Sequence, residues 1–98
     1  MQESGYGFVA DMTVASGKRD EVIALLREGT KDMPGNRLYL IAEDKADADR
    51  IWIVEAWDSA EAHAASLKLP SVIDAIGKAR PMIAGMGSRI EFAPVSGV

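Results

Sequence analysis

The 98-residue chain contains no cysteine, a single histidine and only two each of Trp, Tyr and Phe. Without cysteine it can form no disulfide, no thiol nucleophile and no cysteine-ligated zinc or iron–sulfur centre. Its first residues lack the basic segment and apolar core of a secretory signal. No apolar run approaches the roughly 18 residues that a membrane span requires. We therefore expect a cytoplasmic protein that does not associate with membranes.

Positive charge is also scarce. Eleven Lys and Arg residues face fifteen Asp and Glu residues, which gives a net charge of -4. Nucleic-acid binding through phosphates needs a clustered positive surface, so we do not expect DNA or RNA as a partner. The length suits one domain, and we expect residues 1–98 to form a single domain with a core at about 7–95.

Hydrophobic patterning predicts an α+β protein with the element order β-α-β-β-α-β. The predicted strands are 8–14, 37–43, 50–57 and 88–95. The predicted helices are 18–31 and a region from 58 to 78 that a proline at 70 interrupts. Ser16 is expected to cap the first helix, and residues 85–87 (GMG) are expected to form a flexible turn. This order is that of the ferredoxin-like fold, an antiparallel sheet with both helices on one face.

The second and third predicted strands contain continuous apolar runs at 38–42 (LYLIA) and 51–54 (IWIV). A strand with one face in water is expected to alternate apolar and polar residues instead. The predicted helices can cover only one face of the sheet. A second copy of the chain is the simplest cover for the other face, so the pattern predicts a homodimer packed sheet to sheet.

Three segments follow one another in a distinctive order. Residues 14–21 (VASGKRDE) lead into the first helix, 34–35 (PG) precede Tyr39, and 53–59 (IVEAWDS) precede His63. The last segment combines a strand that ends in Glu-x-Trp with a helix that bears a histidine six residues after the Trp. In this order and spacing, most of the chain resembles the antibiotic biosynthesis monooxygenase family. The resemblance implies a dimeric α+β barrel of the ferredoxin-like class.

The resemblance also implies an activity. The best-known members of that family oxidise anthrones, quinols and similar aromatic compounds with dioxygen, and they use no metal, flavin or haem. It therefore implies a cofactor-free monooxygenase for a quinol or polycyclic phenol. The alternative is a non-catalytic or stress-related dimer that binds a small ligand, because one fold supports many functions. Many relatives carry a second histidine soon after the first, and this chain does not.

His63, Glu55 and Trp57 are the candidate catalytic residues. His63 has the only side chain whose unperturbed pKa lies near neutrality. It is suited to take a proton from a phenol, which leaves an electron-rich anion able to pass an electron to dioxygen. Glu55 and Trp57 share one strand face, and Glu55 is a candidate base or a partner that orients His63. The alternatives are a structural role for His63 and, for Glu55, an interface ion pair with Arg37, Arg50 or Arg89.

Tyr39 and Phe8 are the candidate substrate-binding residues, because a flat aromatic ligand needs aromatic walls. Trp52 and Trp57 are separated by an odd number of positions, so they are predicted to lie on opposite faces of the sheet. Trp57, near His63, is the one expected at the site. Simple core or interface packing is the alternative for all these aromatic residues.

The predicted homodimer has a direct test. Sedimentation equilibrium at micromolar concentration should give twice the 10.5 kDa chain mass. The melting temperature should also rise with protein concentration, because dissociation accompanies unfolding. A stable monomer at micromolar concentration would contradict the prediction.

Overall fold

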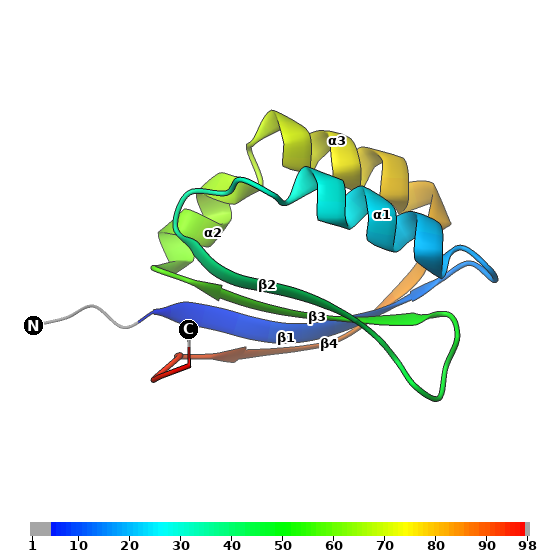
Figure 1. The fold of residues 1–98 in the computed structure, drawn as a ribbon, viewed down its shortest axis with the longest axis horizontal. Coiled ribbons are helices and arrows are strands. Elements are labelled where there is room, and N and C mark those ends of the chain that lie inside the picture. The colour runs from blue at the N-terminus through cyan, green and yellow to red at the C-terminus, as the bar shows by residue number, and fades with distance from the viewer. Residues whose placement is uncertain (1–4, 98) are drawn as a thin grey trace, which may run out of the picture.

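The computed structural model describes residues 5–97, in which four strands form one antiparallel sheet in the order β2-β3-β1-β4. The elements are β1 (Tyr6–Val14), α1 (Arg19–Gly29), β2 (Asn36–Glu43), β3 (Arg50–Trp57), α2 (Ala60–Ser66), α3 (Pro70–Ala79), a 3-10 turn η1 (Arg80–Met82) and β4 (Ile83–Phe92). All the helices lie over one face of the sheet (Figure 1). The predicted ferredoxin-like α+β fold is confirmed. In this part of the chain no helix is long and apolar enough to cross a membrane.

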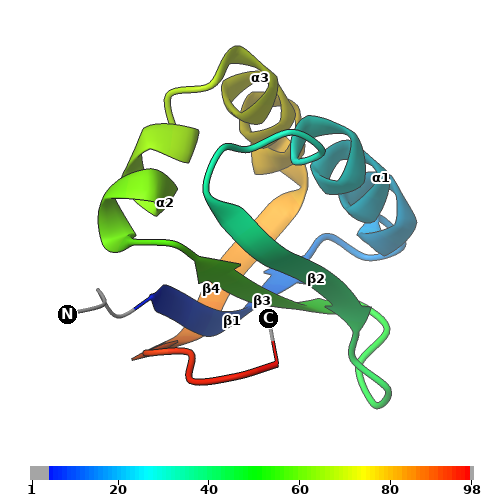
Figure 2. The same ribbon diagram turned by 60° about the vertical axis from the view of Figure 1, so that its left-hand side comes forward.

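The hydrophobic core lies between the sheet and the helices. Alternate residues of β1 and β3 point toward α1 and α3, and removing their side chains from water stabilises the layered arrangement. The largest cluster contains Met12, Val14, Val22, Leu26, Ile51, Ile53 and Ala79. A second cluster, beside α2, contains Met33, Trp57 and Val72. Packing within these two clusters holds the helices against the sheet. Figure 2 shows the helices above the sheet.

The opposite face of the sheet carries an apolar row that none of the helices in the described part of the chain covers. Strand register aligns Leu40 with Val54, Val54 with Val9, and Val9 with Ile90, so the row crosses all four strands. Leu40 is 48% exposed and Ile90 is 62% exposed. Both are large apolar side chains, and a contiguous exposed patch of such residues is typical of an interaction surface.

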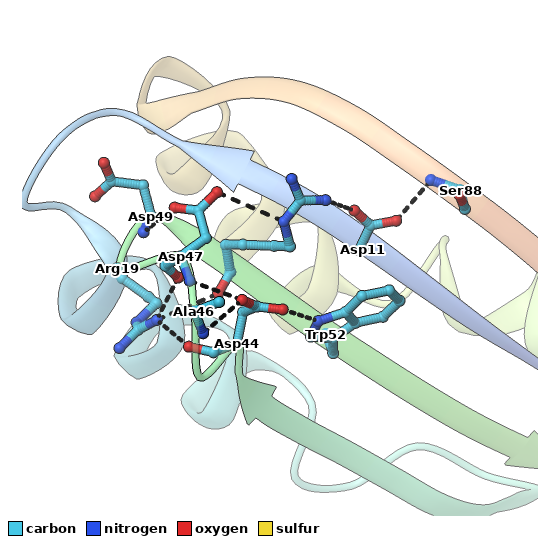
Figure 3. Close-up of polar contacts among 9 residues, drawn as sticks. Asp11, Arg19, Asp44, Ala46, Asp47, Asp49, Trp52 and Ser88 are labelled. Carbon is cyan, nitrogen blue, oxygen red and sulfur yellow. Dashed lines mark hydrogen bonds and ion pairs between the residues drawn. The ribbon is translucent and has the colours of Figure 1, made fainter.

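Polar contacts hold the β2–β3 loop and the β1–β4 pairing. The Arg50 guanidinium donates to Asp11 Oδ2 at 2.5 Å, and the Ser88 backbone N–H donates to Asp11 Oδ1 at 2.6 Å (Figure 3). Trp52 Nε1 donates to Asp44 Oδ1 at 2.7 Å, which lowers the pKa of that carboxyl. Asp11 is buried, so these charge-assisted hydrogen bonds satisfy a carboxylate that would otherwise be costly to bury.

The last strand differs from its prediction. β4 begins at Ile83 rather than at 88 and ends at Phe92 rather than at 95, so residues 85–87 belong to a strand and not to a flexible turn. The reason is tertiary: a Cβ at Gly87 would collide with the Asp11 carboxylate. Pairing with β1 also shifts register between Ala10 and Met12. Glycine therefore permits a close backbone approach here.

The first helix also differs from its prediction. It begins at Arg19, with Lys18 at the N-cap and no side-chain cap, so the expected cap by Ser16 is wrong. Gly17, with φ +76°, forms a left-handed turn between Ser16 and the helix. The helix ends at Gly29, where the Thr30 hydroxyl donates to the Leu26 carbonyl at 2.6 Å.

Two helical glycines give a matched test of the packing between α1 and α3. A Cβ at Gly29 would collide with Ala75 and lie 2.9 Å from the Ser71 carbonyl, whereas a Cβ at Gly77 would meet nothing within 4 Å. Gly29→Ala should lower the free energy of unfolding by about 1–3 kcal/mol through overpacking. Gly77→Ala should raise it by up to about 1 kcal/mol through helix propensity. Urea unfolding at one protein concentration measures both, and a neutral Gly29→Ala would contradict the close packing.

Candidate functional site

A cavity of about 590 Å³ lies between the sheet and the helices. All four strands contribute one wall, and α1, α2 and α3 contribute the other. Most of the lining side chains are apolar, such as Met12, Leu26 and Ile76, and only a few can ionise. A mainly apolar pocket of this volume with few polar groups is typical of a small-molecule site.

The cavity brings together four of the five residues predicted for the site. Phe8, Tyr39, Glu55 and His63 all line it. Strand register explains part of this arrangement, because Glu55 on the central strand β3 lies opposite Phe8 on one side and opposite Tyr39 on the other. Trp57, the fifth, does not line the cavity and instead contacts two of the residues that do.

Glu55 is a carboxyl group that is only 7% exposed on the helix-covered face. Trp57 Nε1 donates to Glu55 Oε1 at 2.9 Å. Burial raises the pKa of Glu55 to about 7, against the opposing effects of the Trp57 hydrogen bond and the positive charge of Arg89. The Glu55 carboxyl group therefore titrates near neutral pH. An ion pair at a sheet-to-sheet interface does not fit this position, which faces the helices.

His63 lies above Glu55 because α2 follows β3 almost directly. The Ser59 hydroxyl accepts a hydrogen bond from the Ala62 backbone N–H at 3.1 Å and so caps α2. This capped turn sets the direction of α2 and brings His63 back over the end of the sheet. His63 Nε2 lies 3.9 Å from Glu55 Oε1, which is longer than a hydrogen bond. Glu55 therefore faces His63 without fixing its orientation through a direct hydrogen bond.

Aromatic rings surround the His63 imidazole. Its ring centroid lies 5.2 Å from that of Phe8, 5.5 Å from that of Trp57 and 5.6 Å from that of Tyr6. Burial lowers the pKa of His63, and the nearby positive charge of Arg89 lowers it further. The imidazole is therefore neutral at neutral pH and has a nitrogen available to accept a proton.

The two tryptophans lie on opposite faces of the sheet, as predicted. Trp57 is completely buried under the helices and donates to Glu55. Trp52 lies on the other face, where it donates to Asp44. Trp57 thus holds a cavity residue in place without lining the cavity itself.

Tyr39 and Phe8 form aromatic parts of the cavity wall. Burial raises the pKa of Tyr39, and the negative charge of Glu55 raises it further. Tyr39 therefore keeps its phenolic proton throughout the neutral range and can act as a donor. The Phe8 ring is buried, and the Arg89 guanidinium lies 3.9 Å from its centroid.

Arg89 and Tyr6 are residues that sequence reasoning did not place at the site. Arg89 lines the cavity and donates to the Tyr6 hydroxyl at 2.7 Å. The only signal in the sequence was an alternating last strand, and alternation alone does not say which of its faces meets the cavity. Within residues 5–97, no three His, Asp or Glu side chains come together in a way that could hold a metal ion.

Comparison with known proteins identifies relatives along nearly the whole chain. The profile of the family described as Antibiotic biosynthesis monooxygenase matches residues 6–78. A protein of Chloroflexus aurantiacus J-10-fl that is named for that family is 49% identical, with 97% of each chain covered and a TM-score of 0.94. A search of curated proteins found no match.

Two further solved structures named for that family share the fold at low identity. A protein of Nitrosomonas europaea is 17% identical with a TM-score of 0.80, and the alignment covers 98% of this chain and 93% of that one. A protein of Caulobacter crescentus CB15 is 19% identical with a TM-score of 0.81, and the alignment covers 96% and 92%.

The raised pKa of Glu55 predicts how stability depends on pH. Because its pKa rises from 4.5 to about 7 on folding, Glu55 contributes stability that is fully present below about pH 4.5 and is lost as pH rises through about 7. Glu55→Gln should abolish this loss, which amounts to up to roughly 3 kcal/mol. Urea unfolding at pH 5 and pH 8, at fixed protein concentration, measures the difference. Equal pH dependence in both proteins would show that Glu55 is not protonated by burial.

Proposed function

Because the chain belongs to the antibiotic biosynthesis monooxygenase family, we propose that it is a cofactor-independent monooxygenase that oxidises a quinol or polycyclic phenol with dioxygen. The family match and its named relatives support a function of the monooxygenase type. The observation that carries the finer proposal is the cavity, in which two groups able to accept a proton near neutral pH, Glu55 and His63, face an otherwise mainly apolar space.

The cavity walls favour a flat aromatic substrate. Phe8 and Tyr39 offer ring surfaces on either side of Glu55, and apolar side chains such as Ile53 and Ile76 complete the space. Aromatic rings stack or meet edge to face with other rings. A volume of about 590 Å³ accommodates a ligand of a few fused rings.

The proposed first step is removal of the phenolic proton by His63. Its imidazole is neutral at neutral pH, so it can accept the proton. The imidazolium that forms then lies 3.9 Å from Glu55 Oε1. An ionised Glu55 stabilises that positive charge, and Trp57 keeps the carboxyl group in position. In this mechanism Trp57 is a positioning residue.

The second step transfers electrons from the substrate to dioxygen. The phenolate passes one electron to dioxygen, and the radical pair combines to form a carbon–oxygen bond. Cleavage of the oxygen–oxygen bond leaves one oxygen atom on the ring, and the other departs as water. A quinol that loses four electrons in this way becomes a hydroxyquinone, so the substrate supplies all the electrons and no external reductant is needed.

We also propose that the protein works as a homodimer. The apolar row Leu40–Val54–Val9–Ile90 is continuous across the sheet and has no cover within the described chain. A second copy that presents the same row would bury both rows against each other, which is favourable for apolar surface.

The proposal predicts a large kinetic effect of replacing His63. Oxygen uptake with a panel of quinols and anthrones, in buffer that contains a metal chelator, measures turnover. His63→Gln should lower kcat by about 10²–10⁴-fold, which is the usual contribution of a general base. Glutamine is preferred to alanine because it fills much of the space between the three rings. The far-ultraviolet circular dichroism of the variant should match that of the wild type.

The pH profile identifies the base. The base must be unprotonated, so kcat/KM should rise with pH as His63 loses its proton, at a pKa below its ordinary value of 6.5. Ionisation of Glu55 near pH 7 should add a smaller second rise, because the carboxylate stabilises the imidazolium. If His63→Gln turned over substrate at the wild-type rate, and its kcat/KM rose with pH near pH 7, the base would be Glu55 instead. No oxygen uptake with any substrate would contradict the monooxygenase proposal and favour a ligand-binding dimer.

A further inference from the structure

A cationic group stands at the edge of the cavity. Arg89 lies on the edge strand β4, lines the cavity, and has a side chain that is 48% exposed. Its guanidinium lies 3.9 Å from the centroid of the Phe8 ring. Register pairs Arg89 with Ala10, so the side chain is on the same face as Glu55 and the helices. Arg89 can therefore contact both solvent and a ligand in the cavity.

Two contacts hold the guanidinium in place. Arg89 Nη2 donates to the Tyr6 hydroxyl oxygen at 2.7 Å, and that hydroxyl donates its own proton to Glu91 Oε2 at 2.5 Å. The Phe8 ring supports the guanidinium plane through a cation–π contact. Fixing this group in advance reduces the entropy cost of binding a ligand to it.

Most of the hydrogen-bonding capacity of Arg89 remains available. A guanidinium carries five N–H donors, and among residues 5–97 the only hydrogen bond from the Arg89 side chain is the one to Tyr6. Glu91 lies 3.8 Å from Arg89 Nη2, which is an ion pair rather than a hydrogen bond. A pre-positioned guanidinium with unused donors at a cavity is suited to bind an oxygen anion.

The charges around Arg89 leave room for an anion. The Glu91 carboxylate is on the exposed strand β4 and already accepts a hydrogen bond from the Tyr6 hydroxyl. Glu55 has a pKa of about 7 because of its burial, so it carries a full negative charge only above neutral pH. His63 is neutral. Arg80, the other arginine in the lining, follows α3 near the far end of β1, where Ile83 pairs with Val14.

We propose that Arg89 is a specificity-determining residue that binds the anionic oxygen of an aromatic ligand, the phenolate of the substrate in the reaction above. The assignment rests on the proposed function for the identity of that ligand. Arg89 then selects substrates whose hydroxyl can ionise. Its charge also favours the phenolate over the neutral phenol, which makes proton removal by His63 easier.

An unreactive pair of probes tests the proposal without turnover. 2-Naphthoate carries an anionic oxygen, and 2-naphthamide is a neutral molecule of nearly the same shape. Arg89→Gln should weaken naphthoate binding by more than about tenfold, because a hydrogen bond to a charged group is lost. The same variant should change naphthamide binding less than about twofold, and Arg89→Lys should restore part of the naphthoate affinity.

Arg27→Gln is the matched control, since it removes one positive charge from an exposed position on α1 outside this cavity. It should leave the affinity for both probes unchanged. If Arg89→Gln lost affinity for naphthoate and naphthamide equally, Arg89 would only pack against Phe8. If Arg89→Gln and Arg27→Gln lost naphthoate affinity equally, the effect would come from the net charge of the protein. Either result overturns the proposal.

A chromogenic phenol gives a second readout that a packing role would not change. The absorbance of bound 4-nitro-1-naphthol reports its ionisation, and its pKa should fall on binding to the wild type but not on binding to Arg89→Gln. An unshifted pKa in the wild type would contradict the assignment. Failure of the proposed function would give a different result from failure of the Arg89 assignment. The protein would still bind naphthoate selectively but would consume no oxygen with any substrate.

Discussion

A carboxyl group buried beneath the helices is the constraint on which the rest of the site depends. Glu55 occupies a strand position whose neighbours on the same face, Ile53 and Trp57, are buried and apolar or aromatic. Burying an ionised carboxylate is costly, and here the cost is limited because the group keeps its proton up to about pH 7. An apolar residue at this position would stabilise the core more. A costly titratable group that faces a cavity is typical of a functional site.

The two faces of the sheet have separate roles: one lines the cavity and the other carries the exposed apolar row. On one face the helices enclose the cavity, and the short connection from β3 to α2 places His63 over Glu55. On the other face the apolar row from Leu40 to Ile90 crosses all the strands, and no helix within residues 5–97 covers it. Association through that face would leave the helix-covered cavity intact, so the proposed dimer and the proposed chemistry are compatible.

Properties that follow from local periodicity could be predicted from the sequence. The two-residue repeat of a strand was sufficient to place Glu55 with Trp57 and to separate Trp57 from Trp52. Properties that arise from tertiary contact could not. The start of β4 depends on the fit of Gly87 against Asp11. The pairing of β1 with β4 also shifts register between Ala10 and Met12, so alternation along the sequence does not predict which face Arg89 occupies. The raised pKa of Glu55 depends on its burial in the assembled core, which no local pattern of residues records.

The most direct test of the account is the fate of the two atoms of dioxygen. Turnover of a quinol substrate under ¹⁸O₂, in chelator-treated ordinary water, should give a hydroxyquinone that carries one ¹⁸O atom, with the second ¹⁸O atom in water. Mass spectrometry of rapidly quenched product measures this incorporation. A product without ¹⁸O, with the label recovered as hydrogen peroxide, would show simple oxidation rather than monooxygenation and would contradict the account.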